Sequence, residues 1–210
     1  MNNELSVQQK IVYFAKQEFL KHGFKDASLR NIATAAGMTT GAIYTYFKDK
    51  NALFEEIVDP VCVKTEELFE ELSASYYNCD TVISDITFQN SLDNLHLIYD
   101  FIYNHFDVYK LLVTGAEGSS RSDFVHTIVD LEVKHTLAYL DKMKSNNNLN
   151  AEIDDTFIHV ISESYINTLL EPVRHNMDKE EALKNLNAIV CFYTGGWQSI
   201  FNEFFNKKNT

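Results

Sequence analysis

The polar side chains best suited to chemistry gather between residues 28 and 50 of this 210-residue chain. Small and hydroxyl-bearing residues come first and basic residues follow: Thr39, Thr40, Gly41, Tyr44, Tyr46, Lys48 and Lys50. Small polar groups can approach base edges, and lysines can neutralise phosphates. This order of residue types suits a helix that lies in the major groove of DNA, with its N-terminal end near the bases and its flanks on the phosphates.

Two short helices are expected to position these side chains. Apolar residues recur at helical spacing on both sides of one glycine: Leu29, Ile32 and Ala33 before Gly37, and Ile43 and Phe47 after it. Gly37 can supply the positive φ of a tight turn, and Ser28 and Thr39 can each cap a helix that follows. The pattern predicts a helix-turn-helix. Any pair of antiparallel helices could show the same apolar spacing, so it is the polar residues that favour DNA.

The stretch from Ile32 to Phe54 resembles the DNA-binding domain of the TetR family of bacterial transcriptional repressors. The resemblance rests on the pattern I-A-x-x-A-G-M-x-x-G-x-I-Y-x-Y-F-K-x-K-x-x-L-F, and its most specific part is the block GAIYTYFKDKNALF. Members of the family diverge beyond this region. The resemblance therefore implies a DNA-binding function and says little about a ligand.

Carried over residue by residue, the resemblance implies DNA contacts by Ser28, Arg30, Thr39, Thr40, Gly41, Tyr44, Tyr46, Lys48 and Lys50. It implies base reading by residues 39–41, backbone contacts by the two tyrosines, and phosphate binding by the two lysines. Arg30 would reach a base or a phosphate, and Ser28 would meet a phosphate as well as cap its helix. Tyr44 has a competing role in the core. Short side chains make few strong hydrogen bonds, so contacts with thymine methyl groups and DNA shape are expected to matter.

The charge of the chain is divided unevenly. The net charge is −12, yet residues 1–50 hold seven Lys or Arg against four acids, and residues 51–210 hold eleven against 26. A basic head on an acidic body directs only the head at DNA, although the acidity also aids solubility. We therefore expect a DNA-binding domain over residues 1–50 and a second domain over residues 51–210.

Composition favours an ordered helical protein of one or two domains, because 45% of the residues are hydrophobic and only 2 are Pro and 7 Gly. There is no long apolar run, and the first residues lack a signal-peptide pattern, so a cytoplasmic location is expected. Cys62, Cys79 and Cys191 are widely spaced, which indicates neither a disulfide framework nor a zinc site. A redox sensor stays open as an alternative.

The periodicity is helical along the whole chain. A capping box at Ser6–Gln9 begins a first helix that Gly23 ends, and Asp49 is the expected N-cap of a fourth helix that runs to about Ser75 with a kink at Pro60. Further stripes predict a helix from Leu92 to Phe106, a shorter one around Tyr109–Val113, and others that begin near Phe124, Ile158 and Ala182. Loops are expected at residues 78–80 and 145–148. The fold class is all-α, with about nine helices and no strand.

The resemblance also implies that the last two helices pair with those of a second copy as a four-helix bundle. Aromatic residues are frequent in both helices, and Gly195-Gly196 lies within the last one, where glycine costs about 1 kcal/mol relative to alanine. Close approach by another helix would justify that cost, and a local bend in a monomer is the alternative. The candidate interface residues are Ile161, Tyr165, Ile189, Tyr193, Trp197 and Ile200.

A ligand pocket in the second domain follows from the resemblance, because the family couples the binding of a small molecule to release of DNA. Aromatic residues offer the apolar surface that such pockets have. The candidates are Tyr99, Tyr103, Phe106, Tyr109, Phe124, His135 and Tyr165. Each of them can equally be a core residue, and His135 can be a core histidine with satisfied hydrogen bonds.

Two further sets of residues have a spacing that metal ligands use. Asp123, His126 and Asp130 share one helix face, and His159 and Glu163 share another. Exposed pairs of this kind are usually ordinary ion pairs, so no metal is expected. The chain has no nucleotide-binding loop, nucleophile elbow or zinc-protease motif, so neither a catalytic set nor a cofactor is expected.

The sequence thus predicts a transcriptional regulator, in the form of a repressor that binds a near-palindromic operator as a homodimer and is released by a small, largely apolar effector. The alternative is a small-molecule carrier, or an enzyme, that keeps a helix-turn-helix as a structural cap. The basic, hydroxyl-rich surface of residues 28–50 separates the two, because a cap would not need it.

Overall fold

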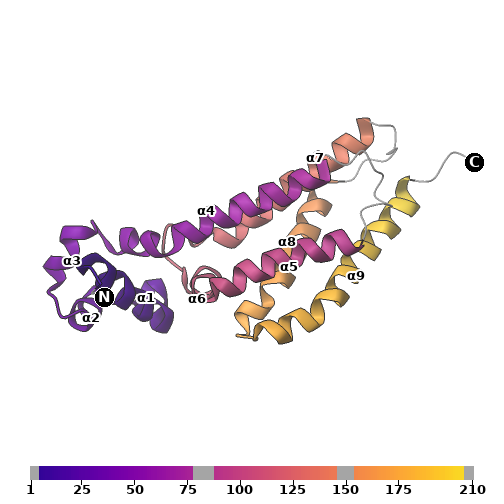
Figure 1. Ribbon diagram of the computed structural model, residues 1–210. Helices are drawn as coiled ribbons and strands as arrows, with labels where there is room; N and C mark the ends of the chain where they lie inside the picture. Colours follow the sequence, from indigo (N-terminus) through magenta and orange to yellow (C-terminus); the bar gives the residue numbers. More distant parts are fainter. Residues whose placement is uncertain (1–4, 78–87, 146–153, 206–210) are drawn as a thin grey trace, which may run out of the picture. The chain divides into compact units, whose positions relative to one another are not determined.

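The computed structural model describes residues 5–77, 88–145 and 154–205. Within these ranges the chain forms nine α-helices and one π-helical turn, and it forms no strand there (Figure 1). This confirms the all-α fold class. Cys79 and the expected loop at residues 78–80 lie outside the described residues, and of the expected loop at residues 145–148 only Ser145 is described, at the end of a helix.

The helices follow each other in the order that their periodicity predicts. Their bounds are α1 Val7–Asp26, α2 Leu29–Ala35, α3 Thr40–Tyr46, α4 Lys50–Tyr77, α5 Phe88–Asn104, α6 Phe106–Lys110, the π-helical turn Leu111–Gly115, α7 Phe124–Ser145, α8 Asp155–Arg174 and α9 Lys179–Phe205.

The chain divides into two compact units. The N-terminal unit comprises Met1–Lys64 and His105–Val125, and the C-terminal unit comprises Thr65–Asn104 and His126–Thr210. Helix α4 contributes residues to both. The N-terminal unit thus includes α6 and the π-helical turn as well as the expected DNA-binding helices. The functional boundary at residue 50 stays a prediction, and each unit is described by itself below.

The core of the N-terminal unit is built on α1. Ile11, Ala15 and Phe19 recur at helical spacing and are fully buried. The ring of Phe19 stacks on Phe24 and meets Phe54 of α4 edge-on, with centroid distances of 6.0 and 5.2 Å. Burial of such side chains is the main force that holds the short helices in place, because helices of two turns are marginal on their own.

Gly23 ends the regular part of α1, as expected. Its φ of 71° and ψ of 170° are not helical, and a short final turn continues to Asp26. A Cβ atom at this position would lie 3.5 Å from the carbonyl oxygen of Gly115. The left-handed φ requires glycine here, and the absence of a side chain lets the chain approach the π-helical turn closely.

Helix α4 begins where the sequence predicts and passes through Pro60 without a break. Asp49 Oδ1 accepts a hydrogen bond of 2.7 Å from the Ala52 N–H, which is the expected N-cap. Pro60 removes the N–H that would bond to the Glu56 carbonyl. Both residues are exposed, so water can satisfy that carbonyl.

One helix boundary was predicted wrongly. Phe106 was expected to continue the helix that begins near Leu92, but α5 ends at Asn104 and Phe106 begins α6. The reason is His105, whose φ of −124° and ψ of 28° lie outside the helical region. The expected short helix around Tyr109–Val113 is α6 followed by the π-helical turn.

The C-terminal unit packs α5 against α9, with α7 and α8 alongside (Figure 1). Its core includes Leu95 and Tyr99 of α5, Leu169 of α8 and Leu186 of α9. The buried Tyr99 hydroxyl donates to the Leu169 carbonyl across 3.3 Å, which satisfies its polar group. None of the described helices is long and apolar enough to cross a membrane.

Candidate nucleic-acid interface and ligand cavity

The helix-turn-helix in the N-terminal unit has the local geometry that its sequence predicts. Ser28 Oγ accepts from the Asn31 N–H at the start of α2, and Thr39 Oγ1 accepts from the Ala42 N–H at the start of α3. Gly37 has a φ of 71° in the turn between them. These caps and this glycine determine where each helix begins and ends.

A carboxylate of α1 holds the start of α2. Glu18 accepts hydrogen bonds from the Ser28 N–H at 3.1 Å and from the Asn31 side-chain amide at 3.0 Å. Burial by itself would raise the pKa of Glu18, but these hydrogen bonds outweigh it and hold the pKa below its ordinary value. The ionised carboxylate therefore stabilises the position of α2 on α1.

Ile32 and Ala33 of α2 and Ile43 of α3 are buried, and the polar residues of both helices are at least partly exposed. Tyr44 and Tyr46 are 54% and 46% exposed, so Tyr44 does not have the core role that was its alternative. Arg30, Thr39, Gly41 and Lys48 are exposed, and Ser28, Thr40 and Lys50 are partly exposed. All nine residues expected to contact DNA are thus at least partly exposed.

Lys50 has a different contact within the chain. Its ammonium donates to the carbonyl oxygens of Phe24, Lys25 and Ala27 at 2.7, 3.0 and 3.2 Å, and it lies 4.6 Å from the centroid of the Phe24 ring. An ammonium has three N–H donors, and three carbonyl acceptors surround this one. Lys50 therefore ties the end of α1 to the start of α4, and Lys48 is the lysine of the pair whose side chain is exposed.

A cavity of about 240 Å³ lies within the C-terminal unit. Helices α4, α5, α7, α8 and α9 all contribute to its wall. Seven aliphatic and six aromatic side chains form the apolar part of the lining, and the aromatic ones are Phe69, Tyr139, Tyr165, Tyr193, Trp197 and Phe201. A cavity wall that combines apolar surface with polar groups is typical of a small-molecule site.

Two of the seven candidate pocket residues, His135 and Tyr165, line this cavity. Tyr99 is a core residue, and Tyr103 donates to the Met177 carbonyl at 3.1 Å. Phe106, Tyr109 and Phe124 belong to the N-terminal unit, where the last two rings meet with centroids 6.2 Å apart. Aromatic periodicity alone does not distinguish these environments, because a core position and a cavity wall both lie on the apolar face of a helix.

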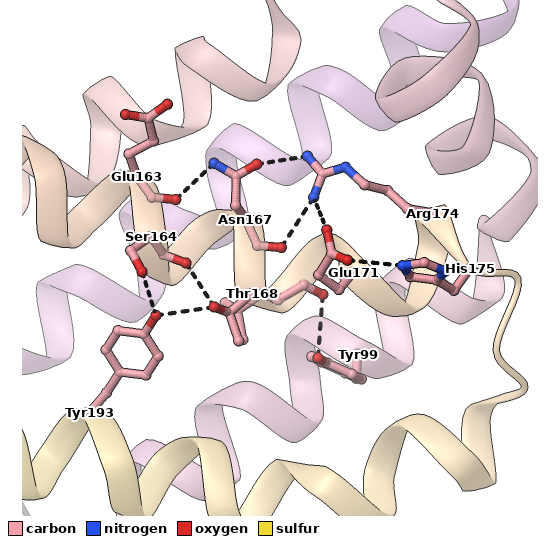
Figure 2. A network of polar contacts seen from close by, with 10 residues as sticks. Tyr99, Glu163, Ser164, Asn167, Thr168, Glu171, Arg174, His175 and Tyr193 are labelled. Atoms are coloured by element: carbon pink, nitrogen blue, oxygen red, sulfur yellow. Dashed lines mark hydrogen bonds and ion pairs between the residues drawn. The ribbon is translucent and has the colours of Figure 1, made fainter.

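Four of the six candidate interface residues also line the cavity: Ile161, Tyr165, Tyr193 and Trp197. Figure 2 shows how Tyr193 of α9 is held, with its hydroxyl 3.1 Å from the hydroxyls of both Ser164 and Thr168 on α8. Ile189 and Ile200 are partly exposed and are not part of the lining.

Large apolar side chains on α8 and α9 are exposed at positions that the sequence reasoning did not select. Phe192 is 74% exposed, Val160 54% and Phe157 37%. They fall outside the main apolar stripe of each helix. Selection by the strongest periodicity therefore picks out the residues that pack inward and omits these three. A search for a second apolar stripe on the polar side of α8 and α9 would have found them.

His135 is both a core histidine with hydrogen bonds and a cavity residue. It is 7% exposed, its Nδ1 lies 2.6 Å from Ser73 Oγ, and its Nε2 lies 3.1 Å from Glu70 Oε2. Lys134 also pairs with Glu70, at 2.9 Å. The Lys134 ammonium first, and His135 second, hold the pKa of Glu70 below its ordinary value.

Glu132 is a charged cavity residue that was not among the candidates from the sequence. Burial raises its pKa to about 7, and only a hydrogen bond with Thr136 acts in the opposite direction. In sequence it resembles any other acidic residue of an acidic domain. Its position one turn before His135, on the apolar stripe of α7, was the available signal.

The residues with metal-ligand spacing form ordinary pairs. His126 lies 3.6 Å from Asp130 and His159 lies 4.0 Å from Glu163, and these side chains are well exposed. Among the described residues, no group of three or more His, Cys, Asp or Glu is placed to hold a metal ion.

Comparison with known proteins connects this architecture to a family. Residues 11–57 match the family model described as "Bacterial regulatory proteins, tetR family". The regulator AcrR of Shigella flexneri is 50% identical over 50 residues, which is 24% of this chain and 23% of AcrR. The repressor AcnR of Corynebacterium diphtheriae is 25% identical over 171 residues, or 81% of this chain and 80% of AcnR.

The first curated relatives are matched over only about a quarter of their own length. The likeness in fold extends further along the chain. It includes the structure of NalD, the secondary repressor of the MexAB-OprM multidrug efflux pump in Pseudomonas aeruginosa, and this match covers 90% of this chain and 95% of the NalD chain. The TM-score is 0.59 at 19% identity, so this likeness concerns the fold. The match over residues 11–57 assigns the helix-turn-helix to the TetR family of bacterial regulatory proteins, and over the rest of the chain the likeness is one of fold.

Proposed function

We propose that this protein is a transcriptional regulator, in the form of a repressor that binds a near-palindromic operator as a homodimer and is released by a small effector. The observation that carries this proposal is the set of exposed polar groups on a helix-turn-helix that has its own buried apolar residues. Ile32, Ala33, Ile43 and Phe47 are at most 5% exposed, while Tyr44 and Tyr46 are about half exposed.

The recognition helix α3 is suited to close approach. Gly41 lies in its first turn, and a Cβ atom there would meet only Thr39 Oγ1, at an ordinary 3.8 Å. Nothing in the chain itself therefore requires glycine at this position. A helix that lies deep in the major groove would require it, because each added atom at its N-terminal end points toward the base edges.

Phosphate contacts would come from the flanks of the helix. Lys48 and Arg30 are exposed, and the first 50 residues carry a positive balance within a chain of net charge −12. Thr39 and Thr40 offer hydroxyl and methyl groups and no bidentate donors, which supports readout by thymine methyl contact and DNA shape. Lys50 would contribute indirectly, since it holds α1 and α4 together.

A homodimer is supported by the exposed apolar side chains of α8 and α9. Phe157, Val160 and Phe192 are exposed, and a Cβ placed at Gly195 or Gly196 would meet no atom within 4 Å among the described residues beyond its chain neighbours and the backbone of its own helix. An open glycine pair beside exposed apolar residues suits the close approach of a helix from a second copy. Two copies would present two recognition helices, as a near-palindromic operator requires.

An effector is supported by the cavity in the C-terminal unit. Its apolar lining with a few polar groups suits a small organic molecule. NalD is described as a repressor of a multidrug efflux pump. An apolar effector would agree with the regulation of a similar pump by this protein. A carrier, or an enzyme with a helix-turn-helix cap, would bind its ligand in the cavity but would give the exposed polar side chains of α3 no function.

A gel-shift titration against the DNA upstream of the protein's own gene tests the proposal. We expect a discrete complex that competitor DNA of random sequence does not displace at equal concentration. The matched control is Gly41→Glu, which places a carboxylate on the exposed side of α3. Equal displacement by the specific and the random competitor, or an unchanged complex with the variant, would contradict the proposed function.

A further inference from the structure

The cavity of the C-terminal unit is lined by one acidic group, Glu132 of α7, that forms no ion pair within the described residues. Its one favourable polar contact is the Thr136 hydroxyl. Other acids that border α7, such as Glu70, are paired with cations. A carboxylate that faces an apolar cavity without a partner is costly unless a bound group compensates it.

Three titratable groups on α4 and α7 are bonded to one another beside the cavity. From α4, Glu70 faces His135 and Lys134 of α7 and is bonded to both. Of these three, only His135 reaches the cavity wall. The lining residues contributed by α5, α8 and α9 are all uncharged, and no described lining residue is a Lys or an Arg. The charge that a ligand meets is therefore the negative charge of Glu132.

The apolar part of the wall suits the same kind of ligand. Six aromatic rings line the cavity, among them Trp197 and Phe201, whose rings stack with centroids 5.5 Å apart. The faces of aromatic rings attract cations, and Trp does so most strongly. Tyr165 and Tyr193 meet at 4.8 Å on the α8 and α9 side of the wall. Carboxylate and rings together form a surface for an organic cation.

We propose that the effector cavity is selective for charge and takes lipophilic organic cations, with Glu132 as the group that recognises the positive charge. This inference rests on the proposed function, because it names the chemical class of effector that the same cavity takes. A ligand with a carboxylate or a phosphate would face Glu132 without a cation to hold it. An apolar cation would gain both the carboxylate and the aromatic rings.

In the ligand-free protein, the carboxyl group of Glu132 would be partly protonated. Burial raises the pKa of this carboxyl to about 7, so part of the molecules carry the proton near neutral pH. A bound cation favours the ionised form and lowers that pKa, so the proton leaves as the cation enters. Cation affinity should therefore rise with pH around neutrality, and binding at pH 7 should release protons.

Three probes of matched shape and different charge test this. They are phenylbutyl-trimethylammonium, its neutral carbon isostere with a tert-butyl group, and the corresponding phenylalkyl carboxylate. The quaternary ammonium has no proton, so any proton released comes from the protein. Calorimetry of the full-length wild-type protein, in two buffers of different ionisation enthalpy, measures affinity and proton release together. We expect the cation to bind about tenfold more tightly than the isostere, and the carboxylate to bind most weakly.

Two variants with the same chemical change complete the experiment. Glu132→Gln removes the negative charge and keeps the shape, so it should abolish both the preference for the cation and the proton release. Glu163→Gln makes the same change at a side chain that is 59% exposed on α8 and does not line the cavity, so it should leave both unchanged. The wild-type probe series needs no variant and stands even if Glu132→Gln fails to fold.

Each outcome decides the inference. Equal binding of cation and isostere, tighter binding of the carboxylate, or a preference that survives Glu132→Gln would overturn it. Binding of none of the three probes would also overturn it, since the cavity would then not accept the predicted class. In all of these cases an intact gel shift with the upstream DNA would show that the proposed regulator survives and only the assignment of its effector fails.

Discussion

The helix-turn-helix and the cavity differ in how far apart in sequence their determining contacts lie. In the helix-turn-helix, the hydroxyls of Ser28 and Thr39 each accept a hydrogen bond from an N–H three residues later. The positive φ of Gly37 requires no contact with another side chain. In the cavity, Ser73 meets His135 and Tyr193 meets Ser164, at separations of 62 and 29 residues. Local contacts can be inferred from a short motif, whereas contacts of the second kind depend on how five helices pack.

This difference also separates the two proposed roles. A recognition surface on one short helix is defined by which groups it exposes, so single substitutions should change DNA binding without changing the fold. A cavity wall shared by several helices is part of the core of its unit, so substitutions there should affect stability and ligand binding together. Substitutions in the two regions test that contrast.

The largest effect should follow from loss of the dimer. Phe192→Glu places a charge on the most exposed apolar side chain of α9. If α8 and α9 form the interface, the variant becomes a monomer. Its operator affinity should then fall by about 10²–10⁴-fold, because a monomer cannot bind two half-sites at once. Sedimentation and operator titration check this.

The control for that variant is Leu97→Glu, since Leu97 is 53% exposed on α5 of the same unit. It should stay dimeric and bind DNA normally. A folded Phe192→Glu protein that still sediments as a dimer would place the interface elsewhere.

The second effect separates two neighbouring lysines. Lys50→Met removes three hydrogen bonds to carbonyl oxygens and should lower the free energy of unfolding by about 1–3 kcal/mol. Lys48→Met should leave stability unchanged and flatten the slope of log K against log salt by about 0.9, the value for one phosphate contact. Thermal melts and salt titrations of both variants measure the two quantities. The reverse pattern would mean that Lys50 leaves α1 to bind DNA.

The third prediction is that one substitution, at Gly41, raises the stability of the protein and lowers its affinity for DNA. Gly41→Ala should stabilise α3 by up to about 1 kcal/mol, because alanine is the better helix former and its Cβ meets only an ordinary contact. The same methyl group should weaken operator binding by crowding the base edges. A variant with higher melting temperature and unchanged DNA affinity would remove α3 from the groove.

The smallest effect concerns pH. Hydrogen bonds from Ser28 and Asn31 hold the pKa of Glu18 below its ordinary value of 4.5. A group with a lowered pKa stabilises the fold above its unfolded pKa and loses that contribution as pH falls through the folded value. The stability advantage of wild type over Glu18→Gln should therefore be constant near neutral pH and shrink below pH 4.5. A constant difference down to acid unfolding would mean that the ionised carboxylate has no special role.

The residues that were predicted correctly share the local character of the helix-turn-helix. The capping box of Ser6 and Gln9, the caps of α2, α3 and α4, and the turns at Gly23 and Gly37 all depend on contacts within a few residues. Periodicity likewise predicted the helices of both units. Hydrogen bonds to near neighbours and the helical repeat are properties that a sequence displays directly.

The errors and omissions have the opposite origin. Lys50 bonds to carbonyls 23 to 26 residues away, so its sequence neighbours could not reveal that role. Tyr109 and Tyr165 occupy equivalent positions on apolar stripes, yet only Tyr165 faces the cavity. Glu132 is distinguished from other acids only by the burial that five packed helices create. Such features depend on the tertiary structure.

The most direct test of the account is selection of DNA sequences by the purified protein from a random duplex library. The account predicts that the selected sequences share an inverted repeat and that Gly41→Glu protein enriches none. It also predicts that Phe192→Glu enriches single half-sites at most. Selected sequences that have no common motif, or the same motif recovered with the Gly41→Glu variant, would contradict the claim that the exposed face of α3 reads DNA.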